Sequence, residues 1–153
     1  TAREIEARVR GRGLQFGLPV DHVVTGRLEA GAASEVLDVG DSTIGDRMGV
    51  DIGPKTIQLY AGLIDDARTV VWNGPMGVFE IPAFAAGTTA IARAVAGVNG
   101  TTIVGGGDSI AAVNQAGVAD RITHISTGGG ASLEFLGGRT LPGVEALTEG
   151  SRL

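Results

Sequence analysis

Cysteine is absent from this sequence of 153 residues, which excludes a disulfide scaffold, a thiol nucleophile and a cysteine-based metal site. The GxxxxGK[ST] pattern of P-loop nucleotide-binding proteins and the HExxH pattern of zinc peptidases are also missing. No GxSxG elbow with a downstream histidine occurs, which argues against a hydrolase triad. Three common classes of enzyme are therefore disfavoured by what the sequence lacks.

Basic charge is scarce as well, because Lys55 is the only lysine and the net charge is -5 with a pI near 4.9. Nucleic-acid binding normally needs a basic face, so we expect no nucleic-acid partner. No apolar run approaches about 18 residues and no signal-like segment opens the chain. We therefore expect a cytoplasmic protein without a membrane partner. A phosphate ligand held by uncharged backbone N–H groups stays compatible with this charge.

Glycine is abundant, with 26 residues, and its distribution indicates many tight turns in a packed fold. A collagen-like repeat is excluded because the glycines follow no three-residue period and only 5 prolines occur. Disorder is excluded by a hydrophobic content of 43% and a mean hydropathy of +0.23.

One pattern occurs three times in the second half of the chain. Short apolar strands are expected at 69–72, 101–104 and 123–126. Each strand ends in a glycine-rich break, at 73–77, 105–109 and 128–130. A helix is expected after each break. The first covers about 84–96, the second runs from its break to 117, and the third runs from its break to 136. Alternating strands and helices predict an α/β fold, a three-layer Rossmann-like parallel sheet with helices on both faces.

The rest of the chain is less regular. We expect a helix over 1–12, a strand over 18–24, a mixed connection over 25–47, and a segment 48–53 that leads into a helix over 54–66. The tail, 137–153, is expected to be an extended surface segment. Because Thr1 falls inside a helical pattern, we expect the chain to be a fragment.

The three glycine-rich breaks predict an anion site. In a doubly wound sheet, ligands bind beyond the carboxyl ends of the strands, where helix N-termini attract negative charge. One such turn is weak evidence, but three on one edge indicate a cradle for a polyphosphate. Asp108 is equally compatible with an ordinary helix-start acid and with a carboxylate that holds Mg²⁺. Ser109 and Ser126 are either caps or phosphate donors, and Glu80 either pairs with a helix dipole or accepts hydrogen bonds from a ribose.

Other noticeable residues have structural interpretations. Five side chains in apolar segments are expected in the core, namely His22, Tyr60, Trp72, Phe79 and His124. Asp51 and Lys55, four positions apart, are expected to form a simple salt bridge or to be solvated. A dinucleotide-binding GxGxxG motif is only partly present at 105–107, and the acidic residue that should follow it is missing.

Six segments together resemble phosphoglycerate kinase, in that family's order and near its spacing. They are 18–21, 48–56, 71–80, 105–109, 126–132 and 141–147. The resemblance covers nearly the whole chain, and the run WNGPMGVFE, residues 72–80, is its most specific part.

The resemblance implies that residues 1–153 are part of the C-terminal, nucleotide-binding domain of such a kinase. The family transfers a phosphoryl group reversibly between 1,3-bisphosphoglycerate and ADP, in glycolysis. The N-terminal domain for 3-phosphoglycerate would be absent here, as would the Gly-Gly-Ala-Lys-like segment and the opening βα units. The parallel sheet is therefore expected to be incomplete at its N-terminal end. We expect the full-length protein to be a monomeric kinase and this chain alone to be inactive.

The resemblance also implies roles for individual residues, with MgATP or MgADP as the ligand. Gly49 and Val78 would lie by the adenosine, and Glu80 would meet the ribose hydroxyls. The remaining cofactor-binding candidates are Asn73, Gly106, Gly107, Asp108 and Ser109, with Asp108 tied to Mg²⁺. Gly128 and Gly129 would offer N–H groups to the transferred phosphoryl group. Two alternatives remain open, a nucleotide-binding α/β module without turnover and an NAD-binding Rossmann domain.

Overall fold

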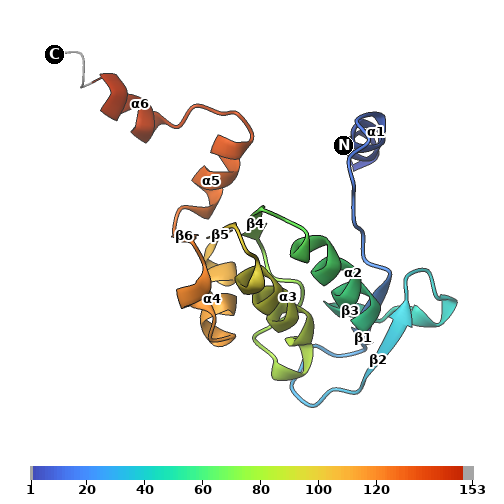
Figure 1. Cartoon of the computed structure of the whole chain (residues 1–153). Coiled ribbons are helices and arrows are strands. Elements are labelled where there is room, and N and C mark those ends of the chain that lie inside the picture. Colours follow the sequence, from blue (N-terminus) through green and yellow to red (C-terminus); the bar gives the residue numbers. More distant parts are fainter. Residues whose placement is uncertain (1, 150–153) are drawn as a thin grey trace.

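The computed structural model describes residues 2–149 as two three-stranded sheets with helices packed on them (Figure 1). The first half contains α1 (Ala2–Gly11), β1 (Asp21–Thr25), β2 (Ser34–Asp38), η1 (Ser42–Ile44), β3 (Met48–Ile52) and α2 (Pro54–Asp65). The middle contains β4 (Thr69–Asn73), η2 (Pro82–Phe84), α3 (Ala86–Gly97), β5 (Thr101–Gly105) and α4 (Gly107–Gln115). The chain continues through η3 (Ala119–Arg121), β6 (His124–Ser126), α5 (Gly129–Leu136) and α6 (Pro142–Glu149).

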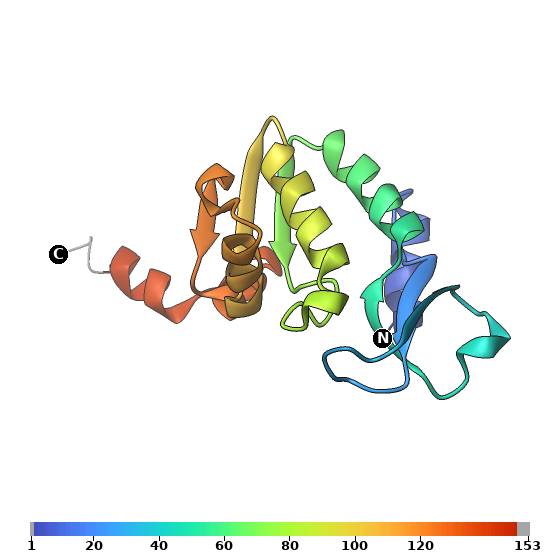
Figure 2. The ribbon, with the colours of Figure 1, turned by 90° about the horizontal axis from the view of Figure 1, so that it is seen from below.

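The second half forms the parallel sheet that the sequence predicts. Its strand order is β4-β5-β6, so each strand pairs with its neighbour in the sequence through a helical crossover. Trp72 and Val104 are paired across β4 and β5, and both are buried in the core beneath α3 and α4. Figure 2 shows these two helices in front of the three strands. On the other face, α5 and the sheet line a cavity of about 320 Å³.

The first half forms a second sheet, which the sequence analysis did not predict. Its order is β2-β1-β3 and both pairings are antiparallel. Strand β2 lies inside the segment 25–47, which was expected to be a mixed connection, and its residues are mostly exposed. An exposed strand has no continuous apolar face, and this explains why the pattern escaped detection.

Helix α2 is attached to this second sheet by the carboxylate of Asp21. The carboxylate accepts hydrogen bonds from Lys55 N (3.0 Å), Thr56 N (2.8 Å) and Thr56 Oγ1 (2.6 Å) in the first helical turn. Pro54 opens the helix, in the position where its missing N–H has no cost. Helices α2 and α3 pack against each other, and Ile52 of β3 joins the core of the parallel sheet. The antiparallel sheet is therefore joined to the core of the parallel sheet through Ile52 and the packing of α2 on α3.

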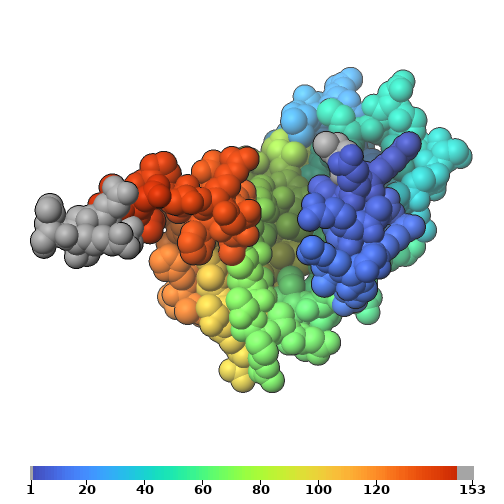
Figure 3. Space-filling model, turned by 90° about the horizontal axis from the view of Figure 1, so that it is seen from above, coloured from blue at the N-terminus to red at the C-terminus, as the bar shows by residue number. Residues whose placement is uncertain are grey.

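The ends of the described region project from this core. The tail, 137–153, was expected to be extended, and this is wrong for α6, Pro142–Glu149, which is a helix, while 150–153 lie outside the described residues. Figure 3 shows α1 and the α5–α6 segment on either side of the surface, with the green segment that contains β4 between them. None of the helices in residues 2–149 has the length and apolar character needed to cross a membrane.

Candidate functional site

The three strands of the parallel sheet end at one level. Asn73 is paired with Gly105 in β5, and Gly105 is paired with Ser126 in β6. The glycine-rich turns that follow the strands therefore lie on the same edge of the sheet, as the sequence predicts. This is the edge at which ligands of open α/β sheets bind.

Two of these turns are in close contact. A Cβ atom added to Gly129 would stand 2.6 Å from both the Cα and the N atom of Gly106, and 3.4 Å from Asn73 Nδ2. Gly106 has a φ of 91°, which L side chains rarely adopt. Only glycine therefore fits at positions 106 and 129. At this point the backbone at the end of β5 meets the start of α5 and the Asn73 side chain.

Two helices begin at this point. Gly106 is the N-cap of α4 and Gly128 is the N-cap of α5. Among the described residues, neither N-cap contributes a side-chain hydrogen bond to its helix. The N-terminal N–H groups of both helices therefore face the sheet edge as donors for an anion.

The other phosphate-site candidates differ in exposure. Gly107 and Asp108 are exposed in the first turn of α4, where an anionic ligand or a cation on it could reach them. Ser109 is fully buried, and its Oγ accepts the Gly74 N–H at 2.7 Å. Ser126 Oγ is 2.8 Å from Ser132 Oγ, so this hydroxyl links β6 to α5. Both serine hydroxyls thus hold neighbouring backbone elements in place.

Residues 74–80, here called the 74–80 loop, connect the end of β4 to η2. The Trp72 indole Nε1–H donates to Gly74 O at 2.7 Å, and Val78 N donates to Val50 O in β3 at 2.8 Å. The second bond places Val78 beside β3, next to the position of Gly49. The two candidates for the adenosine are thereby brought together, with Glu80 exposed at the end of the loop.

Asp51 has a different environment from the one expected. Its side chain is 3% exposed, with Oδ2 accepting Gly87 N (2.7 Å) and Oδ1 accepting Ile52 N (2.9 Å). Burial raises the pKa of this carboxyl above its usual value, although the two backbone N–H groups partly offset the effect. The expected salt bridge with Lys55 is wrong, and the alternative, solvated charges, holds for Lys55 but not for the buried Asp51. Lys55 is exposed, and its Nζ is 2.6 Å from Asp38 Oδ1 in β2.

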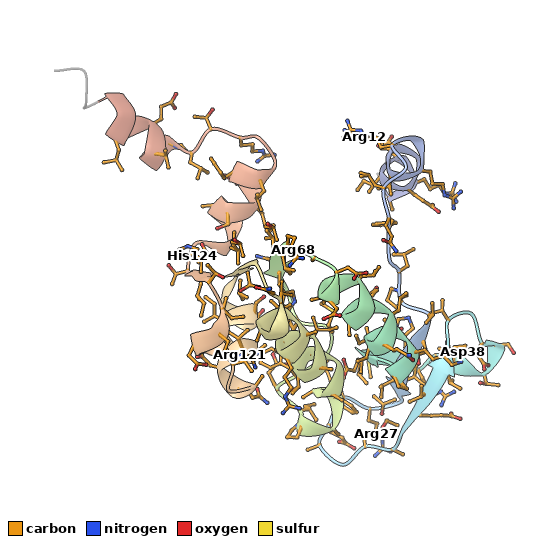
Figure 4. The ribbon with its side chains drawn as sticks, in the orientation of Figure 1. Arg12, Arg27, Asp38, Arg68, Arg121 and His124 are labelled. Atoms are coloured by element: carbon orange, nitrogen blue, oxygen red, sulfur yellow. The ribbon has the colours of Figure 1, made fainter. Side chains whose placement is uncertain are left out.

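The expectation of core histidines is also wrong. His124 is exposed at the start of β6 (Figure 4), and His22 is half-buried beside Gly49. A three-residue strand at the edge of the sheet leaves its first side chain in solvent. The aromatic expectations are confirmed for Trp72 and Phe79, which are buried, while Tyr60 is half-buried against the core.

The carboxylates of the described residues favour one kind of metal binding. Within residues 2–149, no three His, Asp or Glu side chains come together as a ligand set. A cation here would depend on the exposed carboxylate of Asp108 together with oxygens of a bound phosphate. Mg²⁺ is typically bound this way, by one or two carboxylates, water and substrate phosphates.

The family model, the curated relatives and the solved structure that match this chain all carry the same family name. A family model described as phosphoglycerate kinase matches residues 1–139. Two curated relatives with that name come from Koribacter versatilis, 61% identical over 148 residues, and Acidobacterium capsulatum, 58% identical over 143 residues. They are covered to 37% and 35% of their own lengths, while 96% and 93% of this chain is matched. The phosphoglycerate kinase structure from Coxiella burnetii superposes with a TM-score of 0.88 at 41% identity, covering 94% of this chain and 37% of that chain.

Proposed function

The chain belongs to the phosphoglycerate kinase family, and we propose that it supplies the nucleotide side of such a kinase. The chain spans a little over a third of the length of the curated relatives it matches. The proposed reaction is reversible phosphoryl transfer between 1,3-bisphosphoglycerate and ADP, giving 3-phosphoglycerate and ATP. The phosphoglycerate would be held by a part of the full-length protein outside these 153 residues. We further propose that the full-length protein is a cytoplasmic monomer.

The observation that carries this proposal is the contact between Gly106 and Gly129 at the carboxyl edge of the sheet. It brings the N-termini of α4 and α5 to one place, each with free N–H groups. In the proposed complex, Gly106, Gly107 and the start of α4 hold the nucleotide phosphates. Gly128 and Gly129 present the start of α5 to the phosphoryl group during transfer. Such a reaction needs positioning and charge stabilisation rather than a protein nucleophile.

The proposed nucleotide lies along the sheet edge toward β3. Gly49 and Val78 flank the adenosine, and Glu80 accepts hydrogen bonds from the ribose hydroxyls. Asp108 holds Mg²⁺, which neutralises charge on the phosphate oxygens when it is bound. Asn73 and Ser109 act on the backbone that lines the site, since Ser109 holds Gly74 and Asn73 lies against Gly105, Gly106 and Gly129.

A titration followed by Trp72 fluorescence tests this proposal. Trp72 is the only tryptophan in these 153 residues, and its indole is bonded to the 74–80 loop, so with any tryptophan elsewhere in the full-length protein replaced by phenylalanine the emission reports on this loop. In the full-length protein, expressed from the complete reading frame that contains these residues, MgADP should change the emission saturably and NADH should not. A saturable response to NADH with none to MgADP would favour the dinucleotide-binding alternative. Binding without formation of ATP from 1,3-bisphosphoglycerate would favour a module without turnover.

A further inference from the structure

The 74–80 loop is fixed from several sides by groups that do not themselves reach the proposed ligand. Gly74 is held by Ser109 of α4, and Val78 by the backbone of β3. Gln115 of α4 donates from Nε2 to Phe79 O at 3.4 Å. In the middle of the loop, the N–H groups of Met76 and Gly77 both donate to one atom, the hydroxyl oxygen of Thr88.

Thr88 lies in the first turn of α3 and is 1% exposed. Its Oγ1 accepts hydrogen bonds from Met76 N at 3.1 Å and from Gly77 N at 3.2 Å. One buried side-chain oxygen thus serves two consecutive N–H groups of the loop. Without it, these two part-buried N–H groups would have to turn toward water, and the loop would shift.

Asp51 fixes the position from which Thr88 acts. Its carboxylate accepts the N–H of Gly87, the residue before Thr88, at 2.7 Å. Gly77 and Gly87 both pack directly on this carboxylate, where an added Cβ on either glycine would overlap it. Strand β3, the start of α3 and the loop therefore form one connected unit.

We propose that Thr88 is a positioning residue for nucleotide binding, acting through Met76 and Gly77, with Asp51 holding the start of α3 against β3. Thr88 fixes the loop in the position at which Val78 is bonded to β3 and Glu80 would reach the ribose. The loop is then ordered before the nucleotide arrives, so less of the binding free energy is lost in ordering it. This inference rests on the proposed nucleotide-binding function.

The substitutions Thr88→Val and Thr88→Ser separate the hydroxyl from the methyl group. Valine keeps the shape and removes the acceptor, while serine keeps the acceptor. In the full-length protein we expect T88V to raise the Kd for MgADP and the KM for ADP at least about tenfold, because the two N–H groups lose their partner. T88S should stay within about twofold of the wild type, and the KM for 1,3-bisphosphoglycerate should change little in either variant.

Thr102→Val is the matched control. Thr102 is also a buried threonine, 2% exposed, whose Oγ1 accepts Thr123 N at 3.0 Å. It lies near the start of β5, away from the carboxyl edge of the sheet. T102V should lower the free energy of unfolding as T88V does, yet leave the Kd for MgADP unchanged. Equal weakening of MgADP binding by T88V and T102V would overturn the inference.

Two further outcomes distinguish the inference from the proposed function. If the wild type binds MgADP and T88V binds it equally well, the positioning role fails and the proposed function stands. If the wild type does not bind MgADP, the proposed function fails and the inference with it.

Should T88V not fold, amide hydrogen exchange of the wild type decides. Saturating MgADP must then slow exchange at Met76 and Gly77 more than at Thr123, and an unchanged rate at both loop residues overturns the inference.

Discussion

Gly106 and Gly129, which belong to different βα turns, pack backbone against backbone with no room for a Cβ atom on Gly129. This contact joins the end of β5 to the start of α5. Because it also sets the separation between two helix N-termini, it determines where an anion can be held by both at once.

Gly129→Ala should impair phosphoryl transfer, whereas Gly130→Ala should not. The methyl group of alanine at position 129 would lie 2.6 Å from the Gly106 backbone, so α5 must move away from β5. A displacement of this size can lower kcat about 100-fold. Within the described residues, Gly130 has nothing within 4 Å of its Cβ position, so alanine there should keep kcat and stabilise the helix by about 0.5–1 kcal/mol. Steady-state kinetics and urea unfolding of both variants of the full-length protein measure these effects. Equal kcat values for the two variants would contradict the prediction.

The parallel half of the fold could be predicted from the sequence because its signals are local. Each strand is a short β-branched run that ends in glycine, and a helical pattern follows within a few residues. The glycines at 105–107 and 128–130 could be placed on one edge for the same reason, since the carboxyl ends of parallel strands share an edge.

The parts that escaped prediction depend on contacts between distant residues. Asp51 bonds to Gly87, which lies 36 positions away, so its nearness to Lys55 in the sequence was misleading. Thr88 lies in the first turn of an apolar helix, and nothing in the sequence signals that its hydroxyl serves Met76 and Gly77. In the tail, Pro142 and loose polarity favour an extended segment, but Pro142 opens α6, because proline is also common in the first turn of a helix.

Asp108→Asn should weaken binding of MgADP but not of ADP without metal. The exposed carboxylate is the proposed ligand of Mg²⁺, and an amide neither carries its charge nor binds Mg²⁺ as well. We expect the Kd for MgADP to rise about 10- to 100-fold, the range found when groups that support a metal are removed. Calorimetry with and without Mg²⁺ measures both constants. Asp120→Asn, an exposed acid on η3 before β6, is the control and should leave both unchanged. A similar loss of affinity in the absence of Mg²⁺ would argue against a metal-binding role.

Glu80→Gln should reduce discrimination between ribose and deoxyribose. A hydrogen bond to a charged acceptor contributes about 1.5–3 kcal/mol, so loss of the charge should raise the Kd for MgADP about tenfold. The Kd for the 2′,3′-dideoxy analogue should change little, because that ligand has no hydroxyl for Glu80 to bind. Titration of both ligands against both proteins gives a complete thermodynamic cycle. Equal losses for the two ligands would place Glu80 away from the ribose.

The buried aspartates Asp21 and Asp51 should affect stability with opposite pH dependence. Burial opposes ionisation of Asp21, but the hydrogen bonds from Thr56 and Lys55 outweigh it and lower the pKa below 3.8. Its stabilising effect is therefore complete above pH 3.8 and is lost as the pH falls through the folded-state pKa. Burial raises the pKa of Asp51, so the folded state loses stability as the pH rises from 3.8 through the raised value.

The variants Asp21→Asn and Asp51→Asn make this contrast measurable, since neither asparagine titrates. At pH 7 we expect D21N to lower the free energy of unfolding by about 1–2 kcal/mol, because a charged acceptor of three hydrogen bonds is replaced. That difference from the wild type should shrink below pH 3.8. The stability of the wild type relative to D51N should instead decrease as the pH rises above 3.8, because only the wild type must ionise a buried carboxyl. Urea unfolding of the three proteins between about pH 3 and pH 8 tests both trends. If the free energy of unfolding relative to the wild type changes with pH in the same way for both variants, the prediction is contradicted.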